Sequence, residues 1–158
     1  MEKDIQYREA QPQDVQAITE LVLGVFDKYV GYGYSQEEQS VFRMYCHPNA
    51  MTTRLTEGTS FCLVAILAQK IIGMIEVRNG NHIALLFVDD RYHNNGIAKN
   101  LVTLVIEKVK VTDIDVNSSP YAVHIYKRMG FEQLDDEQER DGIRFIPLKK
   151  SITQQDNC

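Results

Sequence analysis

The segment HIALLFVDDRYHNNGIAK, from His82 to Lys99, carries the pattern that decides the fold. It begins with a run of strand-forming residues that ends at Val88, and after a polar turn an apolar pattern at helical spacing starts at Ile97. The middle of the turn, Asn94 to Ala98, consists mostly of small or turn-tolerant residues. We therefore predict a strand, a tight turn and a helix in this order.

This turn has the properties of an anion-binding site. The first backbone N–H groups of a helix lack partners within the helix and lie at the positive end of its dipole. Gly96 lets the backbone approach an anion closely. The segment Asn94 to Lys99 is thus expected to cradle a pyrophosphate, although it has neither the P-loop ending nor the GxGxxG pattern. A short loop with a glycine before a helix is also common without any ligand, so the turn alone leaves both interpretations open.

The flanking sequence predicts the remaining elements by hydrophobic period and by cap and turn residues. Before the segment we expect a strand at Ile5–Arg8, a helix from Gln11 that Gly31 and Gly33 break, a helix from Ser35 to near His47–Asn49, and strands at Phe61–Leu67 and Lys70–Arg78. After it we expect a helix at 97–110, a strand at Val111–Val116, a helix from Ser118 to Met129, and strands at Phe131–Leu134 and Ile143–Leu148. The order β-α-α-β-β-β-α-β-α-β-β predicts an α/β (α+β) fold, with a mixed sheet and helices on both faces.

Length and composition indicate one globular domain. The chain has 158 residues, of which 44% are hydrophobic and 25% charged. We assign residues 1–150 to this domain and expect the polar residues 151–158 to form a disordered tail. The net charge of −5 argues against nucleic acid or an anionic membrane surface as the main partner, and it is compatible with a cationic or amine substrate.

The sequence contains no pattern for export, membrane insertion or metal binding. No apolar run approaches the roughly 20 residues that span a bilayer, and the charged N-terminus does not resemble a leader. The cysteines, Cys46, Cys62 and Cys158, are far apart and lack CxxC spacing, which argues against a disulfide framework and a zinc site. We expect a cytoplasmic protein without a metal.

A second segment, SSPYAVHIYKRMGF from Ser118 to Phe131, lies one predicted strand after the first helix. Together the two segments resemble the signatures of the GNAT superfamily of N-acetyltransferases. Gly96 and Ala98 match the acetyl-CoA signature Gln/Arg-x-x-Gly-x-Gly/Ala. The second segment is similar to Asn-x-x-Ala-x-x-x-Tyr-x-x-x-Gly-Phe, which it matches at Ala122, Tyr126, Gly130 and Phe131. His93, Asn95 and Ser119 depart from the residues that are frequent in the family.

The resemblance covers nearly the whole chain and implies the GNAT fold and acetyl-CoA as co-substrate. It implies transfer of acetyl to a primary amine by direct attack in a ternary complex, with no covalent enzyme intermediate. Tyr126 would protonate the leaving thiolate, a role that suits a phenol hydroxyl, whereas a core aromatic is the alternative without function. The residues that the resemblance places at acetyl-CoA are Leu86, Phe87, Val88, His93, Asn94, Asn95, Gly96, Ile97, Ala98, Lys99, Ser119 and Tyr126.

Two residues are candidates for the base that deprotonates the amine. His82 stands six residues before Val88, where family members with a carboxylate base at the head of this strand carry it. A histidine ordinarily titrates near pH 6.5 and accepts a proton at neutral pH, but a solvated histidine beside a hairpin is an equal alternative. Glu76 is the second candidate, because a charge inside an apolar strand either is paired with a residue such as Arg78 or Lys70 or faces an active-site cavity.

The acceptor side is less defined in the sequence. Tyr29, Tyr32 and Tyr34 lie between the first two helices, where the family resemblance implies a wall of the acceptor site; a surface aromatic patch is the alternative. The main alternative function is a non-catalytic acyl-CoA-binding module. The sequence does not specify the amine, and for any self-association a homodimer is the expected form.

Overall fold

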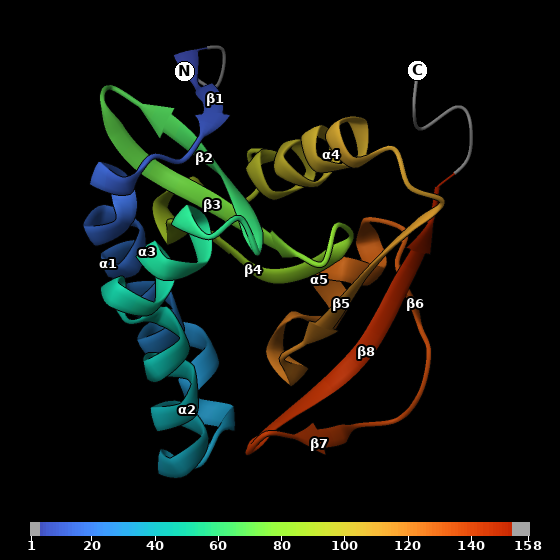
Figure 1. The fold of residues 1–158 in the computed structure, drawn as a ribbon. Helices are drawn as coiled ribbons and strands as arrows, with labels where there is room; N and C mark the ends of the chain where they lie inside the picture. The colour runs from blue at the N-terminus through green and yellow to red at the C-terminus, as the bar shows by residue number, and fades with distance from the viewer. Residues whose placement is uncertain (1–3, 153–158) are drawn as a thin grey trace.

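The computed structural model describes residues 4–152. It contains an eight-stranded mixed sheet with helices on both faces (Figure 1). The predicted fold class is confirmed. In chain order the elements are β1 (Gln6–Glu9), α1 (Val15–Val25), α2 (Gln36–Cys46), α3 (Pro48–Thr56), β2 (Ser60–Leu67), β3 (Lys70–Arg78), β4 (His82–Val88), α4 (Ile97–Val109), β5 (Asp113–Ser118), α5 (Val123–Arg128), β6 (Glu132–Gln133), β7 (Gln138–Arg140) and β8 (Ile143–Ser151).

The sheet has the strand order β1-β2-β3-β4-β5-β8-β6, and β7 pairs with β8 outside this path. Strands β1 to β4 are antiparallel neighbours. Tight turns join β2 to β3 and β3 to β4, whereas α1, α2 and α3 lie between β1 and β2. The one parallel pair among the described strands is β4 and β5, which helix α4 connects. This crossover places the β4–α4 turn at the carboxyl end of β4, beside the neighbouring strand.

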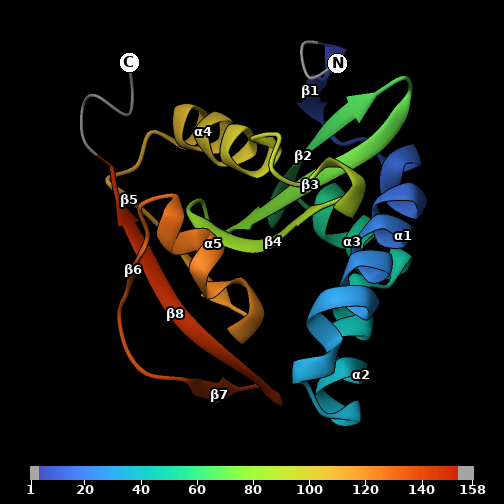
Figure 2. The same cartoon turned by 180° about the vertical axis from the view of Figure 1, so that it is seen from behind.

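Each face of the central strands has its own apolar cluster, as their continuous hydrophobicity predicts. On one face Ile97 and Leu101 of α4 pack with Ile72 and Ile75. On the opposite face the buried residues of α1, α3 and the sheet include Ile18, Val22, Met51, Val64 and Met74. Figure 2 shows α4 and α1 on opposite sides of β2 and β3.

The sheet opens between β4 and β5. The two strands pair only at His82 with Asp115 and at Ile83 with Val116, and towards Val88 they diverge (Figure 1). The register between β3 and β4 shifts at the same level, which leaves Ala84 as a bulge residue. Beyond Ile83 the edge of β4 that faces β5 therefore has backbone groups that pair with no strand in the described part of the chain.

Two elements, α3 and β7, were not predicted, and the predicted tail begins too early. The chain after the second helix forms α3 instead of an irregular segment: Pro48 occupies its first turn, and His47 Nδ1 accepts the N–H of Asn49 at 3.1 Å. A short strand, β7, precedes β8. Strand β8 continues to Ser151, and the N–H of Ile152 donates to the carbonyl of Thr112 at 2.8 Å, so only residues 153–158 of the predicted tail lie outside the described residues. Within residues 4–152 no helix is long and apolar enough to cross a membrane.

Candidate active site

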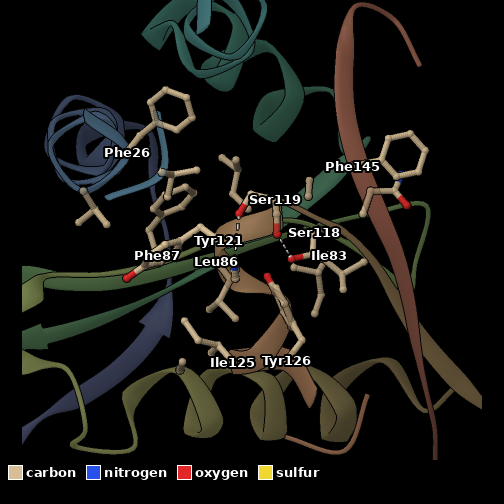
Figure 3. A pocket seen from close by; sticks show the side chains of 18 of the residues that line it. Phe26, Ile83, Leu86, Phe87, Ser118, Ser119, Tyr121, Ile125, Tyr126 and Phe145 are labelled. Atoms are coloured by element: carbon tan, nitrogen blue, oxygen red, sulfur yellow. Dashed lines mark hydrogen bonds between the residues drawn. The ribbon is translucent and has the colours of Figure 1, made fainter. Parts of the chain in front are cut away.

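A cavity of about 720 Å³ occupies the opening between β4 and β5. Residues from the α1–α2 segment, β4, the β4–α4 turn, the β5–α5 connection and β8 line it. Figure 3 shows Phe26 and Phe87 on one side, Phe145 on the other, and Tyr126 below Ser118 and Ser119. Both sequence segments that carry the family resemblance thus contribute to one site.

The β4–α4 turn presents a row of free backbone donors to this cavity. The first hydrogen bond of α4 runs from the N–H of Asn100 to the carbonyl of Gly96 at 2.9 Å, and within residues 4–152 no acceptor is found for the N–H groups from Asn94 to Lys99. Gly96 and Asn94 adopt left-handed conformations, with φ of 77° and 68°. A Cβ on Gly96 would meet no atom of the described residues within 4 Å. This geometry suits a bound pyrophosphate.

The side chains that depart from the family signatures hold the β4–α4 turn and the β5–α5 connection in shape. His93 Nε2 donates to the carbonyl of Val88 at 2.8 Å, since a carbonyl can only accept. The Asn95 amide donates to the carbonyl of Tyr92 at 3.0 Å, and Asn95 does not line the cavity. Ser119 Oγ accepts the N–H of Ala122 at 3.3 Å. Except for Asn95, all the residues expected at acetyl-CoA line the cavity.

Tyr126 combines a core position with access to the cavity. Its ring is 6% exposed and meets Phe131 edge to face, with centroids 5.4 Å apart. No hydrogen bond of its hydroxyl is found among the described residues, and Figure 3 shows this hydroxyl directed towards Ser118 and into the pocket. Burial raises the pKa of Tyr126 well above the usual tyrosine range, so the hydroxyl keeps its proton at neutral pH.

His82 lines the cavity and is bound to Asp115 on β5. The two residues face each other in the β4–β5 register, and His82 Nδ1 lies within hydrogen-bond distance of Asp115 Oδ1. Because a carboxylate only accepts, Nδ1 carries the proton of this bond, and Nε2 of a neutral imidazole is left as an acceptor. A histidine oriented in this way can take up a proton from a bound amine.

Glu76 does not face the cavity, contrary to one of the two interpretations of its position. Its side chain is 1% exposed, forms an ion pair with Arg54 of α3 and accepts the hydroxyl of Ser60 at 2.7 Å. The partner is neither Arg78 nor Lys70. With both carboxylate oxygens occupied, Glu76 has no route to a substrate and a structural role is assigned to it instead.

The three tyrosines of the α1–α2 segment have different environments. This segment forms a π-helical turn, η3 (Phe26–Val30), and a 3-10 turn, η4 (Gly31–Gly33). Tyr34 lines the cavity and donates to the carbonyl of Arg144 at 3.1 Å. Tyr29 lies just outside the lining, where its hydroxyl contacts Asp90 at 3.0 Å beside the β4–α4 turn. Tyr32 is 85% exposed, so the expectation that it walls the acceptor site is wrong.

Two cavity residues that the sequence did not single out as ligands are Arg78 and Tyr45. Arg78 is opposite His82 in the β3–β4 register. The hairpin signal at Asn79–Asn81 could have placed Arg78 beside His82, since pairing across a tight turn fixes the register of the two strands. Tyr45 is brought in by the packing of α2, which the local sequence does not encode. Among the described residues no group of three His, Cys, Asp or Glu side chains is arranged to hold a metal ion.

Several solved structures share this fold, although identities below 20% carry no information on substrates. A GCN5-related N-acetyltransferase from Rhodopseudomonas palustris is 17% identical, with a TM-score of 0.80 over 93% of this chain and 95% of that one. The PaiA N-acetyltransferase from Thermoplasma acidophilum, solved with coenzyme A, is 19% identical, with a TM-score of 0.75 over 94% and 99%. An aminoglycoside 6'-N-acetyltransferase, also with coenzyme A, is 10% identical, with a TM-score of 0.67 over 92% and 96%.

No curated protein sequence matches the chain. A family model does: residues 31–152 match the acetyltransferase (GNAT) domain. The match contains β4, the turn with its free N–H groups, α5 with Tyr126, and β8. From the sequence match and the geometry together, the chain belongs to the GNAT acetyltransferase family.

Proposed function

We propose that the protein is an N-acetyltransferase that moves the acetyl group of acetyl-CoA to a primary amine by direct attack in a ternary complex. One observation carries this proposal: free N–H donors, an oriented histidine and an unbonded tyrosine hydroxyl meet in a single cavity between two diverging strands. Acetyl-CoA, when bound, supplies an activated acyl thioester and a thiolate leaving group.

The chain's own residues divide into those that bind and those that move protons. The N–H groups from Asn94 to Lys99 bind the pyrophosphate, and the exposed edge of β4 offers backbone groups to the pantetheine arm. Apolar side chains at the cavity wall, including Phe87, exclude water. These contacts fix the acyl group next to the acceptor.

Proton transfer is assigned to His82 and Tyr126. His82 Nε2 takes a proton from the ammonium form of the acceptor, so that a neutral amine attacks. Asp115 stabilises the imidazolium that results. Tyr126 donates its hydroxyl proton to the sulfur as the bond to the acyl carbon breaks. The nitrogen releases its second proton to solvent as the amide forms, and Tyr126 regains a proton from solvent. Glu76 has no part in this scheme.

Thermal shift with CoA, acetyl-CoA and ATP tests the binding half of the proposal. A ligand of the native state raises stability according to RT ln(1 + [L]/Kd). We expect a rise with both CoA species and a smaller one with ATP, which lacks the pantetheine arm. Thiol release during an amine screen tests the chemistry. Binding without thiol release in the presence of any amine would identify the non-catalytic module instead, and no shift with CoA would contradict both functions.

A further inference from the structure

The cavity has more positive than negative side chains in its lining, although the chain as a whole is acidic. Within residues 4–152 the cationic lining consists of Arg78, Arg128, Arg140 and Arg144 and, at the pyrophosphate turn, Lys99, against Asp141 as the one acidic side chain. Arg144 is neutralised by Glu38 of α2 at 2.9 Å. A polycationic acceptor would therefore meet repulsion there.

Arg78 is the cation that faces the proposed base, His82, in the register of β3 and β4. It pairs with His82 across the β3–β4 hairpin, so the two side chains leave the same face of the sheet, with Cβ atoms about 5 Å apart. Asp115 stands opposite His82 on the next strand, and its carboxylate is bound to the imidazole. The Asp115 carboxylate therefore binds the His82 imidazole and not the Arg78 guanidinium.

Arg78 and Tyr45 both have unsatisfied polar atoms. Arg78 Nε and the Tyr45 hydroxyl are buried and, in the described part of the chain, find no hydrogen-bond partner. Among the described residues no carboxylate lies within ion-pair distance of Arg78, while Arg54, which also lies over the Tyr45 ring, is bound to Glu76. The Arg78 guanidinium carbon is 5.4 Å from the Tyr45 ring centroid. Buried donors without partners cost stability unless a ligand satisfies them.

We propose that the acceptor is an amino acid, whose carboxylate binds Arg78 and the Tyr45 hydroxyl while its amine lies at His82. A guanidinium is suited to a carboxylate because its parallel N–H groups match both oxygens. The short separation between Arg78 and His82 suits an amine and a carboxylate that are attached to the same carbon, as in an α-amino acid. This inference rests on the proposed acetyl transfer and narrows its substrate class.

The test compares L-amino acids with their carboxamides, which keep the amine but lack the anion. The amine of a carboxamide is less basic, so a larger fraction of it is in the neutral, nucleophilic form at neutral pH. Without a carboxylate site, the carboxamides would therefore react faster than the amino acids. We expect kcat/KM to be about 100-fold higher for the amino acids. Arg78→Gln should remove this preference and Arg78→Lys should retain part of it, whereas Arg43→Gln, on the exposed surface of α2, should leave it unchanged.

Tyr45→Phe separates a binding role from a structural one. Removal of a buried hydroxyl without a partner should leave thermal stability unchanged or higher, while KM for the amino acid rises about 10-fold. Unchanged KM together with lower stability would restrict Tyr45 to a structural role and overturn its part in the proposal.

The outcomes distinguish this proposal from the acetyl transfer itself. Equal or better turnover of carboxamides or polyamines would overturn the amino acid assignment and leave the acetyltransferase intact. If no amine releases thiol, a thermal-shift measurement tests the carboxylate site instead. It compares N-acetylamino acids with N-acetylamino carboxamides as ligands of the CoA-loaded protein. A rise confined to the carboxylates and lost in Arg78→Gln supports the site, and equal shifts for both overturn it.

Discussion

The side chains of Arg54 on α3 and Glu76 on β3 form a buried two-point ion pair, with Nε to Oε2 at 2.7 Å and Nη2 to Oε1 at 3.0 Å. The same guanidinium lies 3.7 Å from the Tyr45 ring centroid and donates to the Tyr45 carbonyl at 2.8 Å. One arginine thus joins α3, the end of α2 and the sheet. For Glu76, a charged residue within an apolar strand, the sequence was compatible with a catalytic or a structural role. The ion pair with Arg54 supports the structural role.

Glu76→Gln is predicted to destabilise the fold without removing catalysis. Loss of one partner of a buried pair leaves an uncompensated charge, so the free energy of unfolding should fall by about 3 kcal/mol in urea titrations. The turnover number per folded molecule should change less than about 10-fold, whereas loss of a general base costs about 10²-fold or more. Replacing both residues by methionine should restore part of the stability. A drop in turnover of the size expected for a base, in a stable variant, would contradict this assignment.

The ion pair between Glu38 and Arg144 predicts acid sensitivity at the other end of α2. Hydrogen bonds from the Arg144 side chain, together with backbone N–H groups, hold the pKa of Glu38 at about 2, below its usual value near 4.5. Because the folded pKa is the lower one, the stability from this pair is complete above about pH 4.5 and is lost as pH falls towards 2. In urea titrations Glu38→Gln should be less stable than the wild type at pH 7 and converge with it at low pH. Glu37→Gln, at the neighbouring exposed position, serves as the control and should run parallel to the wild type.

The sequence predicted those features that local patterns determine. The β4–turn–α4 unit, with Gly96 before the helix, and the mixed sheet follow from hydrophobic period and turn residues. The helix α3 was missed because its start depends on His47 capping a helix that begins at a proline, and its position is fixed by the pair between residues 54 and 76. Tyr32 was misplaced because its role was inferred from the place of its segment in the family, whereas the π-helical and 3-10 turns of this segment leave its side chain exposed.

Tyr126→Phe is predicted to lower turnover selectively. The proposed proton donor to the thiolate is lost, so kcat should fall about 100-fold while KM for acetyl-CoA changes little. The hydroxyl makes no hydrogen bond within residues 4–152, so the melting temperature should stay nearly constant. Steady-state kinetics with thiol detection measure both parameters, and an unchanged kcat would remove Tyr126 from the mechanism.

Substitution of His82 is predicted to shift the pH dependence of the reaction. His82→Ala should lower kcat/KM for the amine by about 10² at neutral pH. The loss should shrink as pH approaches the pKa of the amine, since an amine that is already neutral needs no base. Asp115→Asn should have a smaller effect, because an amide oxygen can still accept the proton of His82 Nδ1. A loss that is constant across pH would indicate that His82 only shapes the cavity.

A matched pair of glycine substitutions tests the cradle. Gly96 and Gly80 have φ of 77° and 83°, and at both a Cβ would meet no atom of the described residues within 4 Å. An alanine at either position should therefore cost a similar 1–2 kcal/mol of stability, roughly, because both adopt the left-handed conformation. Only Gly96 lines the cavity, so only Gly96→Ala places a methyl group where the pyrophosphate would approach the N–H groups. Its Kd for CoA should rise about 10-fold, equivalent to about 1.4 kcal/mol, while that of Gly80→Ala should match the wild type. Isothermal titration calorimetry measures the difference, and equal CoA affinity in the two variants would mean that the pyrophosphate is bound somewhere other than this turn.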